Sequence, residues 1–252
     1  MKKTFLLTAL SVMAMGTAYA QQNETFTVNK VSFTMVYVEG GTFTMGKDKV
    51  TDQDFRSDEP AHQETVGSFY CGETEVTQEL WTAVMGKNPS RYTDSNQNPV
   101  EQVSWGDCRH FVAKLNQLTG KQFRLLTEAE WEFAAKGGTK SKGYVYSGSN
   151  DLQEVAWCFA NSGDRPHAVK QKMPNELGIY DMTGNVYEWT SSGYSRYGTE
   201  PTLKPNEGGY RFVYRGGCDY TDERFSVVHH RNHGQISDAG PHRGMRLALD
   251  AK

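Results

Sequence analysis

Residues 178–189 read GIYDMTGNVYEW, and this stretch sets the structural character of the second half of the chain. Its glycines, aspartate and asparagine favour turns, whereas the tyrosines and the tryptophan around them are large apolar side chains. The same mixture runs from Gly138 to the end of the sequence without helical periodicity. Because a disordered chain is poor in aromatic residues, we expect this half to be folded and rich in ordered loops.

The first half carries clear helical signals. Three segments each begin with a Ser or Thr that suits an N-cap, continue with apolar residues at helical spacing and stop at a glycine. The predicted helices begin at Thr77, Ser104 and Thr127 and end before Gly86, Gly120 and Gly137. In the second and third, Asp107 and Glu130 stand where a capping box requires an acceptor side chain.

Strand signals lie before these helices. Residues 35–46 alternate apolar with small or polar side chains around Gly40-Gly41, which predicts two short strands joined by a tight turn. Residues 48–64 are charged, contain Pro60 and are predicted to form a surface loop. No linker-like change of composition interrupts residues 35–252, so we expect one α+β domain, preceded by a polar lead segment at 21–34.

Residues 1–20 have the pattern of a secretory signal peptide. Lys2 and Lys3 precede an apolar run at 5–15, and Ala18-Tyr19-Ala20 supplies small residues for cleavage. The run is shorter than the roughly 20 residues that a bilayer-spanning helix needs, so we expect no membrane insertion. No cysteine lies near the cleavage point to carry a lipid, and the mature protein is expected to be periplasmic or secreted.

The charge of the chain argues against nucleic acid as a partner. The 252 residues include 27 Lys and Arg and 30 Asp and Glu, which gives a net charge of −3. Loss of Lys2 and Lys3 with the leader makes it −5. A weakly acidic protein without a basic run lacks the positive charge that a phosphate backbone or an anionic lipid surface needs.

The cysteines leave two alternatives open. Cys71, Cys108, Cys158 and Cys218 are widely spaced, and each has aromatic or aliphatic neighbours in the sequence. An even number in an exported protein allows two disulfides, whereas the apolar surroundings suit buried thiols. None forms a CxxC motif, so a zinc ribbon or a thioredoxin-type site is not expected.

Six ordered blocks together resemble the formylglycine-generating-enzyme or sulfatase-modifying-factor family, over residues 35–249. The blocks are VYVEGGTFTMG at 36–46, EVTQ at 75–78, PVEQVSW at 99–105, RLLTEAEWE at 124–132, the stretch at 178–189, and RGG at 215–217 with GMRLA at 244–248. The resemblance implies a compact α+β fold related to C-type lectins, with few regular elements and much ordered loop.

The resemblance also implies a chemistry that this sequence does not support. The family's enzyme oxidises a cysteine of a client sulfatase to formylglycine with molecular oxygen and a copper ion held by two cysteine thiolates. That pair lies between the Arg-Gly-Gly turn and the closing Gly-x-Arg strand, and here residues 219–243 contain no cysteine. Cys218 stands where the family commonly has Ser. Because soft thiolates are what copper(I) requires, we do not expect a copper site.

A calcium site is the metal site that the resemblance does imply. The family's loop carries over to the side chain of Asp181, the carbonyl oxygens of Gly184 and Val186, and the side chain of Glu188. Oxygen ligands on a glycine-containing turn suit calcium, which we expect to be structural. The alternative is that Asp181 and Glu188 are ordinary turn and surface acids. No other cofactor-binding residue and no catalytic residue are assigned.

The histidines near the carboxyl terminus raise a second metal hypothesis. His229, His230 and His233 lie close together in the sequence, with His242 nearby, and Asp219, Asp222 and Glu223 stand before them. Adjacent histidines on a strand point to opposite faces, so a shared metal requires a helical or looped backbone here. The alternative is that these histidines are solvated or hydrogen-bonded.

Two functional hypotheses follow. The first is an exported, calcium-stabilised binding or scaffold module without oxidase activity, whose ligand is a protein, a peptide or a glycan. The second is a formylglycine-generating-type oxidase, or another metal-dependent oxygenase, that acts on a protein cysteine through a non-standard metal site at His229–His233. The missing cysteine pair favours the first. Arg231 and Arg246 resemble framework arginines of the family and are expected to form structural ion pairs.

Overall fold

The computed structural model describes residues 22–48, 60–197 and 211–251. The predicted signal peptide at 1–20 lies outside these residues, as does most of the expected loop at 48–64. Among the described helices, none combines the length and the apolar character needed to cross a membrane.

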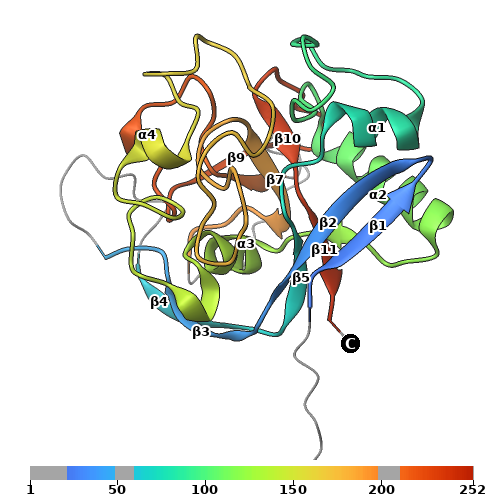
Figure 1. Ribbon diagram of the computed structural model, residues 1–252. Coiled ribbons are helices and arrows are strands. Elements are labelled where there is room, and N and C mark those ends of the chain that lie inside the picture. The colour runs from blue at the N-terminus through green and yellow to red at the C-terminus, as the bar shows by residue number, and fades with distance from the viewer. Residues whose placement is uncertain (1–21, 49–59, 198–210, 252) are drawn as a thin grey trace, which may run out of the picture.

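One sheet joins the two ends of the described chain. Its strand order is β1 (Glu24–Val28), β2 (Val31–Val38), β5 (Phe69–Gly72), β11 (Leu247–Asp250) and β6 (Arg124–Leu125). All neighbours are antiparallel, and Figure 1 shows the β1–β2 ribbon running beside β5 and β11. The segment at 21–34, expected to precede the domain, therefore contributes β1 and the start of β2.

An aromatic cluster explains why the lead segment is structured. The ring of Phe26 on β1 lies 5.7 Å from that of Phe33 on β2 and 5.1 Å from that of Phe123. These contacts bury one face of β1, whose other face is polar. The strand has only five residues, so its alternation of polar and apolar side chains is too short to predict a strand from the sequence.

The remaining strands form two further sheets. The larger has the order β10 (Arg243–Met245), β7 (Tyr187–Gly193), β8 (Arg211–Arg215) and β9 (Arg231–Gln235), and only its β10–β7 pair is parallel. The smaller pairs β3 (Gly41–Met45) with β4 (His62–Val66). The two short strands predicted within 35–46 are confirmed as the end of β2 and β3, but they do not pair with each other, because they belong to different sheets. A Cβ at Gly40, between them, would lie 2.6 Å from the backbone of Gly67.

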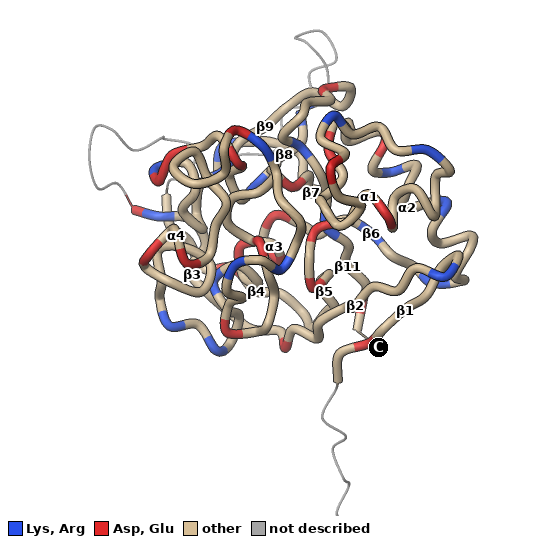
Figure 2. The backbone as a smooth tube through the Cα atoms, turned by 45° about the horizontal axis from the view of Figure 1, so that its top comes forward, with Lys and Arg blue, Asp and Glu red and all other residues tan. Residues whose placement is uncertain are grey.

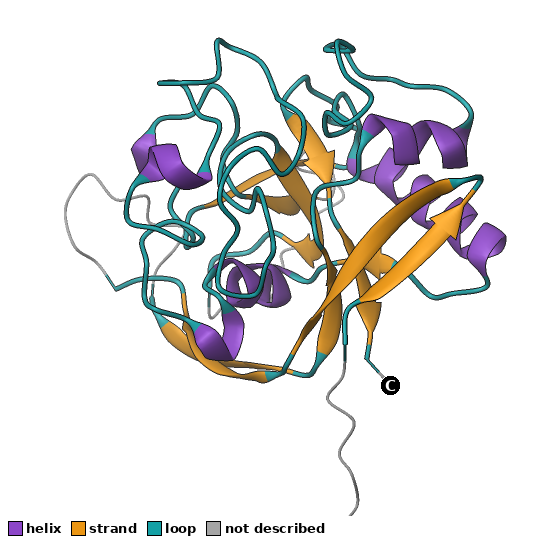
Figure 3. Cartoon of the chain, in the orientation of Figure 1, coloured by secondary structure: helices purple, strands orange, loops and turns teal. Residues whose placement is uncertain are grey.

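The three predicted helices are confirmed. They are α1 (Gln78–Met85), α2 (Trp105–Thr119) and α3 (Glu128–Ala135), and their N-caps are Thr77, Ser104 and Thr127. Gly86 and Gly120 end the first two in the left-handed conformation. After Gly137 the described chain has only short helical turns, namely η2 (Gly138–Lys140), α4 (Leu152–Val155) and η3 (Glu223–Phe225). Figure 3 shows the long loops that surround them.

Aromatic side chains hold these loops and helices together. Trp81 of α1 stacks on Phe111 of α2 with ring centroids 4.8 Å apart, and Trp189 of β7 lies 5.1 Å from Tyr214 of β8. The expected folded, loop-rich second half is confirmed, because Ile179, Met182 and Trp189 are almost completely buried. Figure 2 shows basic and acidic residues interspersed along the described chain.

The cysteines are buried thiols and do not form disulfides. Cys71, Cys108, Cys158 and Cys218 are all buried and free. Burial disfavours a thiolate, and it raises the pKa of Cys71 to about 12.

Thiol titration tests this assignment. In metal-free buffer at pH 8 without reductant, we expect almost none of the four thiols of the native protein to react with a thiol reagent, because all four are buried. After denaturation, all four thiols should react. A denatured protein in which no thiol reacts would instead establish two disulfides.

Candidate functional site

A buried ion pair lies at the centre of the site. The Arg246 guanidinium donates to both carboxylate oxygens of Glu188, with N–O distances of 2.6 and 3.0 Å. Trp131 Nε1 also donates to Glu188 at 2.7 Å, and all three side chains are about 1 % exposed. Glu188 is therefore buried and is not an ordinary surface acid, which was the alternative to its role as a calcium ligand. Both of its carboxylate oxygens already accept hydrogen bonds from Arg246 or Trp131, so they are not free to bind calcium.

Asp181 is in a different state. Its Oδ2 accepts the backbone N–H of Lys170 at 2.8 Å, whereas Oδ1 is buried and has no hydrogen-bond partner. The residue has a φ of 58°, which turns the chain between Tyr180 and the buried Met182. A buried carboxylate oxygen without a donor is costly unless a cation or a proton satisfies it.

The turn after Asp181 packs tightly against a neighbouring loop. Gly184 has a φ of 79°, and a Cβ there would lie 2.3 Å from the Trp157 carbonyl oxygen. Its N–H donates to the Gly216 carbonyl at 2.8 Å. The following Asn185 donates from its backbone to Trp157 at 2.8 Å, which fixes the peptide groups up to Val186.

Glu75 is a member of this site that the sequence did not identify. It is 2 % exposed and accepts only long hydrogen bonds, at 3.2 Å from Asn185 Nδ2 and 3.4 Å from the Val186 N–H. Burial and the nearby Asp181 and Glu188 carboxylates raise the pKa of Glu75 well above its ordinary value. Burial likewise raises the pKa of Asp181 to about 6, with Glu188 adding to the shift.

The charges of this cluster suit a bound cation. Three buried carboxylates, on Glu75, Asp181 and Glu188, share the single buried guanidinium of Arg246. Asp181 Oδ1 lacks a donor, and Glu75 is held only weakly. Asp181 and Glu75 thus offer carboxylate oxygens of the kind that calcium prefers, whereas those of Glu188 accept from Arg246 and Trp131.

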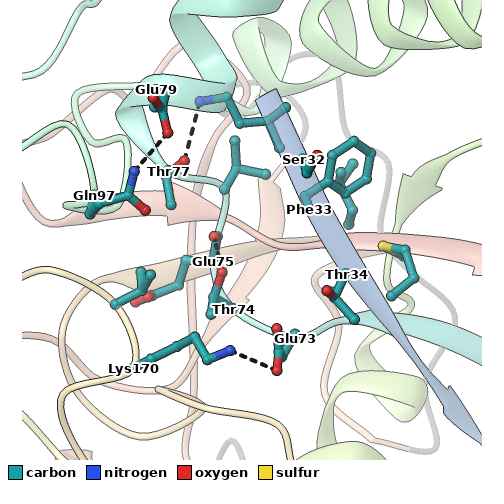
Figure 4. A pocket seen from close by; sticks show the side chains of 16 residues that line it. Ser32, Phe33, Thr34, Glu73, Thr74, Glu75, Thr77, Glu79, Gln97 and Lys170 are labelled. Carbon is teal, nitrogen blue, oxygen red and sulfur yellow. Dashed lines mark hydrogen bonds and ion pairs between the residues drawn. The ribbon is translucent and has the colours of Figure 1, made fainter. Parts of the chain in front are cut away.

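A pocket of about 200 Å³ opens beside Glu75. Figure 4 shows Lys170 reaching Glu73, with an Nζ–Oε1 distance of 2.8 Å, and Gln97 donating to Glu79 at 2.7 Å. Glu73, Glu75 and Glu79 make the lining acidic, and Lys170 is its one basic side chain. Of the three buried carboxylates in the cluster, Glu75 is the one that lines this pocket.

The structure does not bring His229, His230 and His233 to one point. His229 and His230 lie in the loop before β9, and their carbonyl oxygens accept hydrogen bonds from Arg215 Nη1. His233 lies on β9 opposite Val213, with its ring 3.9 Å from that of Tyr194. Among residues 22–48, 60–197 and 211–251, these histidines form no group of three metal-ligating side chains.

A different group does converge. One ligand atom from each of Cys218, Asp219 and His242 lies within 4.8 Å of the other two. This is the one group of three metal-ligating side chains that converges in this way in the described chain. The sequence marked all three residues individually, but 23 residues separate Asp219 from His242. Only the fold shows that they meet.

The framework arginines form the expected buried ion pairs. Arg231 Nη2 lies 2.5 Å from Glu128 Oε2, and its Nε lies 2.7 Å from Oε1. Arg215 pairs with Glu132, which also binds Lys136 at 2.6 Å. These pairs tie α3 to β8 and β9.

The fold and the 178–189 turn define a formylglycine-generating-enzyme-like domain of the α+β class. Residues 20–251 match the family described as Sulfatase-modifying factor enzyme 1-like domain, and the chain belongs to this family.

Three known proteins illustrate the similarity. The chain is 34% identical over 231 residues to Chaperone protein LppX of Paenibacillus barcinonensis, covering 71% of this chain and 79% of that protein. It is 42% identical over 131 residues to Inactive C-alpha-formylglycine-generating enzyme 2 of Bos taurus, covering 47% of this chain and 40% of that protein. The structure of Treponema denticola variable protein 1 superposes with a TM-score of 0.79 at 30% identity, covering 92% of this chain and 100% of that one.

Substitution of Arg246 tests the importance of the central ion pair. Arg246→Met leaves the Glu188 carboxylate buried without its cation, so we expect a loss of about 3–5 kcal/mol in the free energy of unfolding. The matched control is Asp250→Asn, which breaks the 2.6 Å ion pair between Asp250 and Arg124. The Asp250 side chain is 76% exposed. That change should cost less than about 1 kcal/mol in urea unfolding. Equal losses in the two variants would refute the central role of Arg246.

Proposed function

We propose that this chain is an exported member of the family that binds a protein or peptide partner and does not oxidise cysteine. The family membership supports the domain type, and the leader pattern at 1–20 supports export to the periplasm or beyond. The observation that carries the proposal is the arrangement of the thiols. Cys71 lies on β5, Cys108 on α2 and Cys158 in a loop, and no cysteine follows Cys218.

The thiol arrangement bears directly on the chemistry that the family uses. All four cysteines are buried and free, and the residues after the Arg215-Gly216-Gly217 turn offer one thiol rather than two. Copper(I) held by a pair of thiolates needs both of them. Similarity to an inactive formylglycine-generating enzyme and to a chaperone supports a binding role.

A groove between α4 and η3 supplies a surface for a partner. It has a volume of about 730 Å³, and Tyr146, Leu152 and Phe159 give it an apolar side. Phe159 is 65% exposed, which is the largest exposure among the large apolar side chains of the described chain. A large exposed aromatic side chain beside a groove is typical of a contact that a partner buries.

The charges of the groove define the chemistry of that partner. Asp151, Asp222 and Glu223 line it together with a single basic residue, Arg224. Arg224 is already paired with Asp222 at 2.6 Å. The groove therefore suits a peptide segment in which an apolar side chain stands next to Lys or Arg.

A displayed library of random peptides tests this function. We expect the mature protein to enrich peptides with an apolar residue beside a basic one. Phe159→Ala should weaken binding of an enriched peptide about tenfold, whereas the control Leu118→Ala, at a side chain 48% exposed on α2, should leave it unchanged.

The same preparation addresses the oxidase alternative. Supplied with copper(I) and oxygen, it should leave the cysteine of a sulfatase-derived peptide unconverted, as judged by mass spectrometry. Conversion to formylglycine would overturn the proposal, and enrichment of glycans instead of peptides would overturn the choice of partner.

We also propose that a structural calcium ion binds beside the 178–189 turn. Asp181, the carbonyl oxygens of Gly184 and Val186, and the Glu75 carboxylate are the residues that would hold it. The support is the buried Glu75 carboxyl group, which accepts only long hydrogen bonds, and the unpartnered Asp181 Oδ1. Bound calcium supplies the positive charge that the carboxylates lack.

Removal of calcium tests this site. Saturating calcium should raise the melting temperature of the protein relative to EDTA, because a ligand at 100 times its Kd stabilises the native state by about 2.7 kcal/mol. Asp181→Asn should abolish that rise, and Asp250→Asn should retain it. Equal calcium responses in the two variants would place the ion elsewhere, and no response in the parent protein would refute the site.

A further inference from the structure

The convergence of Cys218, Asp219 and His242 lies apart from the residues that the proposed function uses. His242 Nδ1 is 2.6 Å from Asp219 Oδ1, and the Cys218 sulfur completes a group whose ligand atoms all lie within 4.8 Å of one another. Cys218 and Asp219 are fully buried, and the His242 side chain is 23% exposed.

The backbone holds two of these residues firmly in place. Gly216 and Gly217 have φ values of 101° and 75°, and a Cβ at Gly217 would lie 2.9 Å from Thr221 Oγ1. The Asp219 N–H donates to the Asn185 carbonyl at 2.9 Å, and the Asp219 carbonyl accepts Ser162 Oγ at 2.6 Å. The side chains of Cys218 and Asp219 are therefore presented by a rigid turn, as a preorganised site requires.

Two buried carboxylate oxygens at this place have no hydrogen-bond partner. One is Asp219 Oδ2, and the other is Glu101 Oε2, in a side chain that is also fully buried. Glu101 Oε1 accepts the N–H groups of Arg91 and Tyr92 at 2.5 and 2.8 Å, so only its second oxygen is unsatisfied. Tyr92, which donates to Glu101, has its ring 6.4 Å from that of His242, so Glu101 lies beside the group. Two such oxygens in one neighbourhood indicate a missing positive charge.

One side of the group faces solvent. The His242 ring lies between two tyrosines, with centroid distances of 4.4 Å to Tyr220 and 6.4 Å to Tyr92. Tyr220 is 50% exposed, so His242 forms the accessible edge of a site that is otherwise enclosed. An ion can reach the site from this edge.

We propose that Cys218, Asp219 and His242 bind a divalent first-row transition ion of the zinc type, with a fourth position open toward solvent. A thiolate, an imidazole and a carboxylate are all zinc ligands, and three protein ligands with one open position are typical of an accessible zinc site. Calcium is excluded here by the sulfur and nitrogen donors. The site also differs from a copper site held by two thiolates, because it contains one sulfur.

The proton balance of binding is simple. The Cys218 thiol loses its proton to solvent when the metal–sulfur bond forms. The proton shared by His242 Nδ1 and Asp219 leaves Nδ1 if that atom ligates the ion, and the ring then carries its proton on Nε2. A catalytic triad of thiol, imidazole and carboxylate explains the group less well than a metal site does, because the Cys218 sulfur is fully buried and cannot reach a substrate.

Titration with cobalt(II), followed by competition with zinc(II), tests the site in the full mature protein. We expect one ion per chain and a thiolate-to-cobalt charge-transfer band in the near ultraviolet, which zinc then removes. Cys218→Ser should abolish the band. His242→Gln and Asp219→Asn should each weaken zinc binding by at least about 100-fold, since changes to mere supporting residues already cost 10–100-fold.

Matched controls separate the site from the rest of the chain. Cys108→Ser removes another fully buried thiol, in α2, and His110→Gln removes an exposed histidine of the same helix. Both should bind cobalt with an unchanged band. Because His242 is partly exposed, His242→Gln should fold even if Cys218→Ser does not. A cobalt complex without the band, or unchanged affinity in His242→Gln, would overturn the proposal, whereas the peptide-binding function stands or falls separately on Phe159.

Discussion

The contact between Arg246 and Glu188 is the constraint on which the rest of the structure depends. Arg246 stands between β10 and β11, and its guanidinium also donates to the Gly72 and Tyr180 carbonyls at 2.9 and 2.8 Å. One side chain thus joins the end of β5 in the first sheet to Glu188 on β7 in the second. A charge this deeply buried is tolerated because each guanidinium nitrogen has an acceptor, and these bonds hold the two sheets together.

Trp131 connects this ion pair to a second buried network. Its Nε1 donates to Glu188, and its ring lies 5.2 Å from the Arg215 guanidinium, which pairs with Glu132. Both networks therefore meet on α3, a helix of eight residues. The family's architecture is preserved by these ionic contacts, and none of them involves a thiol. A chain can consequently keep the fold while it loses the cysteine pair.

Local features of the fold could be predicted from the sequence, and distant pairings could not. The helices follow from caps such as Ser104 with Asp107, where the interacting groups are three residues apart. The partner of β2, by contrast, depends on strands elsewhere in the chain, so the two strands within 35–46 could be predicted but the sheets to which they belong could not. Glu75 escaped notice because its contact with Asn185 spans 110 residues. Asp181 was identified through a motif, but whether its oxygens had partners depended on packing that no motif records.

The position of β11 governs when the molecule is able to fold. This strand, Leu247–Asp250, lies between β5 and β6, so β6 cannot join the first sheet until the last residues of the described chain are present. Arg246 arrives equally late, and without it Glu188 has no cation. Contacts between the two ends of a chain close slowly because they pay the largest loop entropy. The growing polypeptide can therefore neither complete this sheet nor give Glu188 its cation until that last strand has been made.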